Sequence, residues 1–190
     1  MTMIRPGTAA DIPAITAIYR DAVLNGTATY ELDPAPDEAE MTARFHAITD
    51  AEYPYLVAEE DGAIIGYAYA GPFRARPAYR FMAENSVYLA PGSQGRGLGR
   101  RLMQALIEAC EARGFRQIVA VIGDATPQSA SVKLHTALGF QLCGVMKGSG
   151  YKHGRWLDTT LMQLPLNGGN TLPPDPHSVP ERRYLANKKG

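Results

Sequence analysis

The sequence has few of the residues that form disulfides or bind structural metals. Its 190 residues include two cysteines, Cys110 and Cys143, and four histidines. Two cysteines cannot form the disulfide framework of a small secreted domain, and their spacing matches no zinc motif. Since no group of metal-ligating residues stands at a recognisable spacing, we expect no metal cofactor. We interpret Cys110 as a free thiol buried on the apolar side of a helix.

The chain also lacks an excess of either charge and any long apolar run. Lysine plus arginine and aspartate plus glutamate each number 19, so the formal net charge is zero. A broad nucleic-acid-binding face usually needs a basic excess, and a membrane helix needs about 20 apolar residues. The first residues lack the apolar stretch of a signal peptide. These absences favour a cytoplasmic protein with no nucleic-acid or membrane partner, although neutrality leaves room for a local basic patch.

What the sequence contains is the mixture of helical and strand patterns typical of an α/β protein. The predicted strands cover residues 4–6, 55–59, 63–69, 84–89, 117–122, 141–147 and 156–164. The predicted helices cover residues 12–23, 37–48, 98–114 and 129–138. Asp61 and Gly62 separate two of the strands and predict a hairpin turn, because both residues tolerate a positive φ.

The chain divides into a domain over residues 1–165 and a tail over residues 166–190. Four prolines of the tail lie among glycine, asparagine, serine and charged residues, namely Pro173, Pro174, Pro176 and Pro180. This composition predicts an extended or disordered arm. An arm that packs along a partner subunit is the alternative.

Residues 94–99 (Q-G-R-G-L-G) form the most informative segment, because they follow a predicted strand and open a predicted helix. Glycines let the backbone approach a ligand closely, and the start of a helix offers unpaired N–H donors. With Arg96, Arg100 and Arg101 nearby, this arrangement suits a pyrophosphate. The spacing is neither the G-x-G-x-x-G of dinucleotide-binding folds nor a nucleotide-triphosphate loop. A glycine-rich turn that binds nothing is the alternative interpretation.

Together with Leu138-Gly139-Phe140 after a later helix, this loop resembles the GNAT acyltransferase superfamily, whose loop binds the pyrophosphate of acetyl-CoA. Longer stretches are similar to the phosphinothricin and methionine sulfoximine N-acetyltransferases of that superfamily. They are residues 27–31, 67–80, 83–88 and 152–158. The likeness implies a mixed, mostly antiparallel sheet that splays between its middle strands and holds acetyl-CoA in the split. It also implies a homodimer in which residues 74–80 help to shape an amino-acid pocket.

The resemblance further implies which residues contact the cosubstrate. They are Val87, Tyr88, Leu89, Gln94, Gly95, Arg96, Gly97, Leu98, Gly99, Arg100 and Gln128. We expect the main-chain amide of Tyr88 or Leu89 to polarise the thioester carbonyl, whereas the side chains of Val87 and Leu89 can equally be core. Gln128 stands where similar enzymes often carry asparagine, so its contact is left open.

Two residues are candidates for proton transfer. Glu84 begins the strand that leads into the loop, and a partly dehydrated carboxylate there would have a raised pKa and act as a general base. A surface ion pair is the alternative role for Glu84. His135 precedes Leu138-Gly139-Phe140 and can protonate the leaving thiolate or assist the amine, since imidazole titrates near neutrality. Its alternative role is to order the helix by hydrogen bonding.

The expected acceptor site combines Tyr30, Glu31, Asn85 and Ser86 with two arginines, Arg74 and Arg76. Guanidinium groups match carboxylates and phosphinates in bidentate fashion, although two arginines can also form a solvated strand edge. The sequence thus predicts an N-acetyltransferase for a small amino acid or an analogue such as phosphinothricin or methionine sulfoximine. The alternatives are a peptide or protein N-acetyltransferase on the same fold and a non-catalytic CoA-binding sensor.

Overall fold

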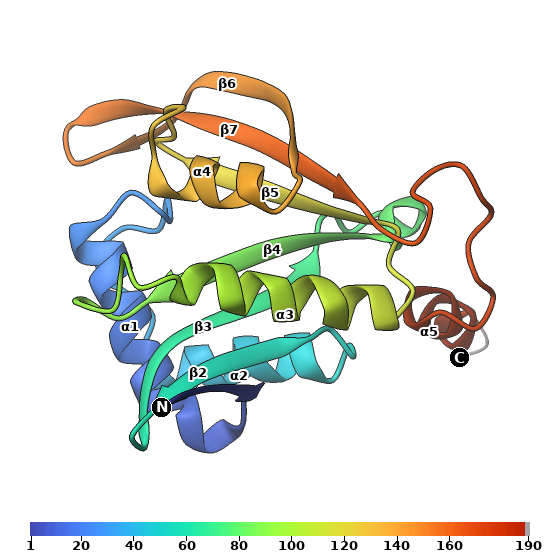
Figure 1. Ribbon diagram of the computed structural model, residues 1–190, viewed down its shortest axis with the longest axis horizontal. Helices are drawn as coiled ribbons and strands as arrows, with labels where there is room; N and C mark the ends of the chain where they lie inside the picture. The colour runs from blue at the N-terminus through green and yellow to red at the C-terminus, as the bar shows by residue number, and fades with distance from the viewer. Residues whose placement is uncertain (189–190) are drawn as a thin grey trace.

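The computed structural model describes residues 1–188, and a seven-stranded sheet runs through them in the order β1-β2-β3-β4-β5-β7-β6 (Figure 1). Its strands are β1 (Thr2–Pro6), β2 (Tyr55–Glu60), β3 (Ala63–Pro72), β4 (Met82–Leu89), β5 (Gln117–Gly123), β6 (Gln141–Lys152) and β7 (Arg155–Pro165). Among the strands of the described residues, only β4 and β5 pair in parallel, and every other pair of neighbours is antiparallel. The expected mixed, mostly antiparallel sheet is therefore confirmed.

Five α-helices accompany this sheet within the described residues. They are α1 (Ile12–Asn25), α2 (Glu38–Thr49), α3 (Leu98–Ala112), α4 (Ala130–Ala137) and α5 (Val179–Asn187). Asp37 caps α2 by accepting a hydrogen bond from the Glu40 N–H, and Ser129 caps α4 in the same way from Val132. No helix in residues 1–188 is both long and apolar enough to cross a bilayer.

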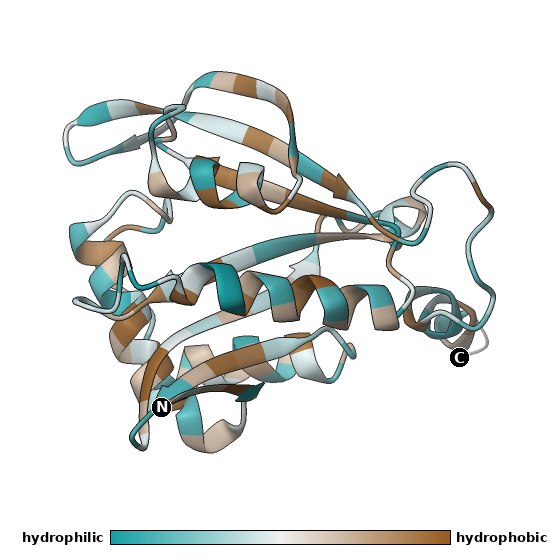
Figure 2. Ribbon diagram, viewed as in Figure 1, coloured by the Kyte–Doolittle hydropathy of each residue, from teal (hydrophilic) through white to brown (hydrophobic). Residues whose placement is uncertain are grey.

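Two apolar clusters hold the helices against opposite faces of the sheet. Alternate side chains of a strand point to opposite faces, so Ala58 and Ala68 pack with α3 while Val57 and Tyr67 pack with α1 and α2. Figure 2 shows the matching apolar positions along the strands and α3. The hairpin between β2 and β3 turns at Asp61 and Gly62, both with positive φ, as predicted. The first half of the sheet is thus covered on both faces.

β4 and β5 separate halfway along their length. Their parallel pairing covers Met82–Asn85 against Gln117–Ala120, whereas β4 continues to Leu89 and β5 to Gly123. At the start of the pair, the Phe81 carbonyl accepts hydrogen bonds from the amides of Arg116 and Gln117. We call the paired stretch the closed end and residues 86–89 with 121–123 the open end. Figure 1 shows the two strands diverging toward the open end, so the expected splay is confirmed.

The tail differs from its sequence prediction. Residues 179–187 form α5, so the expected extended or disordered arm is wrong for this stretch. Pro180 stands at the start of the helix, where a missing N–H leaves no intrahelical hydrogen bond unmade. The connection from β7 is held by Arg116, which is buried and donates to the carbonyls of Gly169, Leu172 and Pro173. The ion pair between Arg80 and Glu181 then fixes α5 to the domain. Amino-acid composition does not reveal these long-range contacts, so it could not predict the helix α5.

Candidate active site

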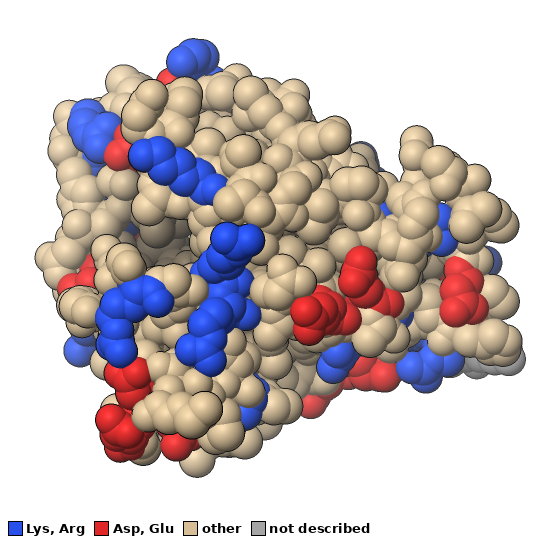
Figure 3. All heavy atoms as spheres, in the orientation of Figure 1, with Lys and Arg blue, Asp and Glu red and all other residues tan. Residues whose placement is uncertain are grey.

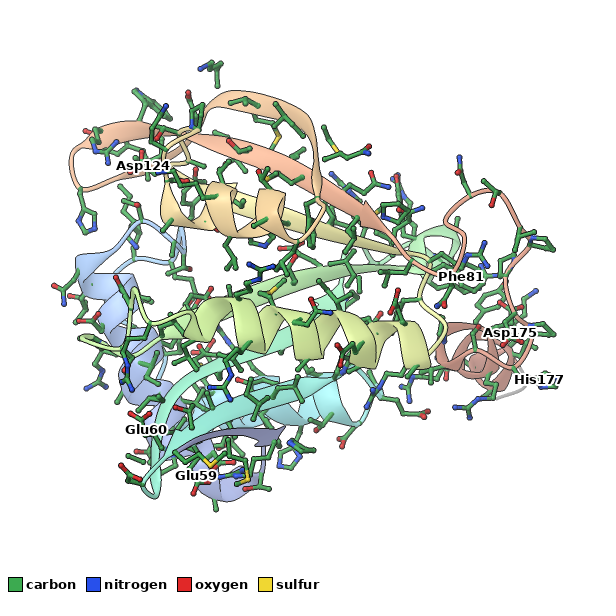
Figure 4. The ribbon with its side chains drawn as sticks, in the orientation of Figure 1. Glu59, Glu60, Phe81, Asp124, Asp175 and His177 are labelled. Atoms are coloured by element: carbon green, nitrogen blue, oxygen red, sulfur yellow. The ribbon has the colours of Figure 1, made fainter. Side chains whose placement is uncertain are left out.

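A cavity of about 430 Å³ occupies the open end of the split. Its walls come from six parts of the chain: the connection after α1, β3, the second half of β4, the second half of β5 with the residues after it, α4 with its N-cap, and β7. Figure 4 labels Asp124, which follows β5 beside this cavity, and Phe81, which precedes β4 at the opposite, closed end. The split therefore provides a binding site at one end and a hydrogen-bonded join at the other.

One edge of β4 is unpaired along the cavity. The Ala90 N–H donates to the Ile65 carbonyl of β3 at 3.0 Å, and the pairing of β4 with β3 has no register shift. Since N–H groups alternate in direction along a strand, the amide of Tyr88 faces β3, while those of Val87 and Leu89 face the split. Of the two amides considered from sequence, only that of Leu89 thus faces the split, and Leu89 itself lies just beyond the residues that line the cavity. This edge offers main-chain donors and acceptors to an extended ligand.

The glycine-rich loop lies at the same end, between β4 and α3. Gly95 and Gly97 have φ values of +75° and +74°, a backbone conformation that disfavours residues with a Cβ, and Gly97 is the N-cap of α3. A Cβ added at either position would meet no atom within 4 Å, so the space beside the loop is open. Leu98 is buried and anchors the helix start. The loop therefore fits the predicted diphosphate site.

Basic side chains gather on this face around a hollow between the start of α3 and α4 (Figure 3). Arg96 forms an ion pair with Glu60, with oxygens 2.8 and 2.9 Å from its Nη2, so part of its charge is already balanced. Gln94 and Arg100 are exposed beside the loop. The face thus combines exposed cationic groups with the amides of the loop.

Glu84 contributes a carboxyl group to the cavity wall. It lies opposite Gly71 of β3, and alternation places it on the same face as Ser86, which also lines the cavity. Burial raises the pKa of Glu84 above its ordinary value of 4.5. A half-buried carboxylate with a raised pKa has the property required of a general base.

His135 lies on the cavity wall from α4 and is only 2% exposed. Its Nδ1 is 2.7 Å from the Ser131 carbonyl oxygen, and its Nε2 is 3.0 Å from Nδ2 of Asn85. The ring also packs edge-on against Phe140. Burial lowers the pKa of His135, which favours the neutral imidazole. Asn85 therefore directs its amide at His135 and α3 rather than at the face of Glu84.

The predicted acceptor residues are only partly brought together. Tyr30 lines the cavity and donates from its hydroxyl to the Asp158 carbonyl at 3.0 Å. Glu31 instead forms an ion pair with Arg44 at 2.6 Å and is not in the cavity wall. The structure thus supports a cavity position for Tyr30 and Ser86 but not for Glu31.

The cavity wall of this chain also lacks Arg74, Arg76 and Gln128, together with Leu89 and residues 94–100, which were predicted to contact the cosubstrate. Arg74 and Arg76 are exposed in the connection between β3 and β4, which joins those strands at the closed end. Gln128 is exposed before α4. Within one chain, neither arginine is among the residues that line the cavity with Glu84.

Sequence reasoning missed Tyr69, Asp124 and Thr159, which also line the cavity. Tyr69 had a usable signal, since alternation along β3 sets it on the face of Ser86, its partner in β4. Thr159 pairs with Gly123 across β5 and β7, a contact between segments that local patterns do not connect. Within residues 1–188, no three His, Cys, Asp or Glu side chains gather as a metal site would require.

Comparisons with known proteins agree with this geometry. A family model described as "Acetyltransferase (GNAT) domain" matches residues 4–161. The chain is 53% identical over 165 residues to a phosphinothricin N-acetyltransferase of Alcaligenes faecalis, covering 87% of this chain and 83% of that protein. It is 43% identical over 171 residues to an L-methionine sulfoximine/L-methionine sulfone acetyltransferase of Pseudomonas paraeruginosa, covering 90% and 98%.

A solved structure gives the same result in three dimensions. The crystal structure of a phosphinothricin acetyltransferase from Sinorhizobium meliloti in complex with acetyl-CoA superposes with a TM-score of 0.91 at 52% identity. The match covers 95% of this chain and 96% of that one. With its split sheet, its glycine-rich loop and these relatives, the chain belongs to the GNAT family of acetyl-CoA-dependent acetyltransferases.

Proposed function

We propose that this protein moves the acetyl group of acetyl-CoA to the amine of a small amino acid or analogue, of the phosphinothricin or methionine sulfoximine type. The observation that carries the proposal is the position of Glu84. Its half-buried carboxyl group shares one cavity with the unpaired edge of β4, so a base and a row of main-chain amides face the same space. The substrates named for the similar enzymes of Alcaligenes and Pseudomonas support the acceptor class.

Glu84 acts as the general base in this proposal. An amine is protonated near neutrality and must lose a proton before its nitrogen can attack the thioester carbon. The carboxylate of Glu84 accepts that proton, directly or through a water, and its raised pKa improves the match with the amine. The new C–N bond forms as the C–S bond breaks, and the thiolate of CoA leaves with the electron pair. The nitrogen then loses its second proton to solvent, which gives the neutral amide, and the thiolate takes up a proton from solvent.

The unpaired amides of β4 stabilise the charge that develops in this step. The Leu89 N–H is placed to donate to the carbonyl oxygen of the thioester, as an oxyanion hole does. Val87 offers its main chain to the extended arm of the cosubstrate on the same edge. At the other end, the amides of residues 95–99 bind the diphosphate, with Gln94, Arg96 and Arg100 alongside. Gln128 completes the proposed cosubstrate contacts from before α4.

The acceptor occupies the remaining space beside Tyr30 and Ser86. A cavity of about 430 Å³ that also receives the acetyl end of the cosubstrate favours a free amino acid over a peptide. We place Arg74 and Arg76 in the acceptor site only through a homodimer, in which a second chain supplies them as the carboxylate or phosphinate partner. An Arg74→Ala/Arg76→Ala chain mixed with a Glu84→Gln chain should then regain activity in the heterodimer. Failure to regain any activity would remove the two arginines from the acceptor site.

The test is a panel of acceptors assayed with acetyl-CoA by release of free thiol. Phosphinothricin, methionine sulfoximine and methionine sulfone should be acetylated, and peptides with a free N-terminus should not. Turnover of peptides alone would make this protein a peptide N-acetyltransferase. Tight binding of acetyl-CoA without turnover of any acceptor would instead identify a sensor of CoA.

A further inference from the structure

We infer that His135 is a positioning residue: through Asn85 it holds the two halves of the split sheet together at the point where they diverge. In this role it transfers no proton during the reaction. The inference rests on the proposed function, because it assumes that acetyl-CoA binds in the split.

Asn85 stands at the vertex of the split. It is the last residue of β4 that pairs with β5, opposite Ala120. Its side chain is 7% exposed and lies on the α3 face, with Nδ2 3.7 Å from the sulfur of Met103. α4 follows β5 along the chain and belongs to the other half of the molecule. The 3.0 Å contact between Asn85 and His135 therefore joins the half that carries β4 to the half that carries β5.

The hydrogen-bond partners assign the proton on the His135 ring. The Ser131 carbonyl oxygen can only accept, so the Nδ1 atom at 2.7 Å must carry the hydrogen. In the neutral ring Nε2 is then an acceptor, and it receives the N–H of Asn85. The burial that lowers the pKa of His135 favours this neutral form. Neither nitrogen is free to give a proton to a thiolate, because one N–H is bonded within α4 and the other nitrogen has no hydrogen.

The side-chain oxygen of Asn85 is a second, independent observation that the orientation of its amide is fixed. Its Oδ1 is buried and has no hydrogen-bond partner among the described residues. Such an atom is unfavourable, and a buried amide normally rotates to avoid it. Rotation here would turn Oδ1 toward the unprotonated Nε2 of His135, where two acceptors would repel. His135 therefore fixes the orientation of the Asn85 amide.

The consequence of this contact lies in the next four residues of β4. Immediately after Asn85, the amides of Val87 and Leu89 face the split with no strand opposite them. The separation between β4 and β5 sets how these amides meet a ligand between the strands. Loss of the contact between Asn85 and His135 should therefore loosen cosubstrate binding and misplace the Leu89 amide.

Three variants test this role. His135→Gln keeps an acceptor, its side-chain oxygen, where Nε2 stands, but cannot act as an acid, whereas His135→Phe removes the acceptor. Asn85→Leu removes the donor at similar volume. We expect His135→Phe and Asn85→Leu each to raise the Kd for acetyl-CoA and lower kcat by about tenfold, the scale of one lost buried hydrogen bond. When His135→Phe and Asn85→Leu are combined in one chain, their effects on Kd and kcat should not add. His135→Gln should restore most of both quantities and keep the wild-type pH profile of kcat.

Thr136→Ala, an exposed position on α4, is the matched control. Thermal melting of each variant checks that it folds. If His135→Phe does not fold, the comparison of His135→Gln with the wild type is used in its place. Two results would overturn the inference. One is a His135→Gln enzyme with normal acetyl-CoA affinity but a kcat as low as His135→Phe and a lost limb of its pH profile. The other is an Asn85→Leu enzyme with unchanged Kd and kcat. If the wild type acetylates no acceptor, the proposed function fails, while calorimetric Kd values still test the contact between Asn85 and His135.

Discussion

The closed end and the open end belong to the same two strands, β4 and β5, but they have different functions. At the closed end, four residue pairs continue the sheet, and buried side chains such as Ile118 pack beneath it. At the open end, the same strands leave their facing edges unpaired and border the cavity. The difference shows that the binding site of this protein forms where β4 and β5 do not make the interstrand hydrogen bonds of an ordinary sheet.

The comparison predicts that variants of side chains that line the cavity change catalysis, whereas variants of side chains buried at the closed end change stability. Unpaired main-chain groups at the facing edges of β4 and β5 cost free energy when no ligand is bound. The paired stretch must therefore hold the two strands in place, so that a ligand can bind between them at the open end.

The largest effect is expected for Glu84→Gln. The amide keeps the shape of the side chain but cannot accept the proton of the amine, so kcat should fall by about 10²–10⁴-fold. Steady-state thiol release measures kcat, and calorimetry should find nearly unchanged acetyl-CoA affinity. Glu108→Gln, an exposed carboxylate on α3, is the control and should keep wild-type activity. A Glu84→Gln enzyme of normal kcat would leave the cavity without its base.

Ile118→Ala should give the next largest effect, and on stability. Ile118 is fully buried at the closed end, and removal of its side chain should lower the free energy of unfolding by about 2–5 kcal/mol. Val121→Ala on the same strand is the matched variant, since Val121 is 37% exposed and lines the cavity. Urea unfolding should separate the two, with Val121→Ala altering KM more than stability. Equal losses of stability would erase the proposed division between the ends.

The pH dependence of kcat/KM should reveal the environment of Glu84 in the cavity wall. Glu84 works as a base only when it is ionised, and burial raises its pKa above 4.5. Activity should therefore be present above the raised pKa and fall about tenfold per pH unit below it. A pH profile of the wild type measures this limb. Its persistence in the residual activity of Glu84→Gln would assign the limb to another group.

The smallest effect is expected for Gly97→Ala. A residue with a Cβ at φ +74° costs about 1–2 kcal/mol, which should weaken acetyl-CoA binding several-fold as the loop shifts. Gly144→Ala on β6 is the control, because a Cβ there meets nothing within 4 Å and its φ is not in the left-handed region. Calorimetry compares the two. Equal affinities would show that the loop conformation does not set cosubstrate binding.

Much of the fold could be predicted because it depends on local chemistry. Asp37 and Ser129 cap helices at the positions their side chains favour. Gly114, the last residue of the helix predicted over residues 98–114, has a φ of +80° and lies just beyond the end of α3. The site was harder to predict. Tyr30 reaches the wall through a bond to Asp158, which lies 128 positions away in the chain, and Glu31 is diverted to Arg44 by an equally non-local ion pair. The helix α5 was missed because the contacts that hold it are non-local: Arg80 forms an ion pair with Glu181 of the helix, and Arg116 holds the connection that precedes it.

The amino-acid sequence by itself determined the order of the elements, the turn at Asp61 and Gly62, and the glycine-rich loop, because periodicity, capping and φ preferences act over a few residues. Only the tertiary structure decided that β4 and β5 part after Asn85, that the Leu89 amide rather than the Tyr88 amide faces the split, and that His135 meets Asn85. These features depend on how α3 and α4 pack against different halves of the sheet, and no local preference along the chain encodes that separation.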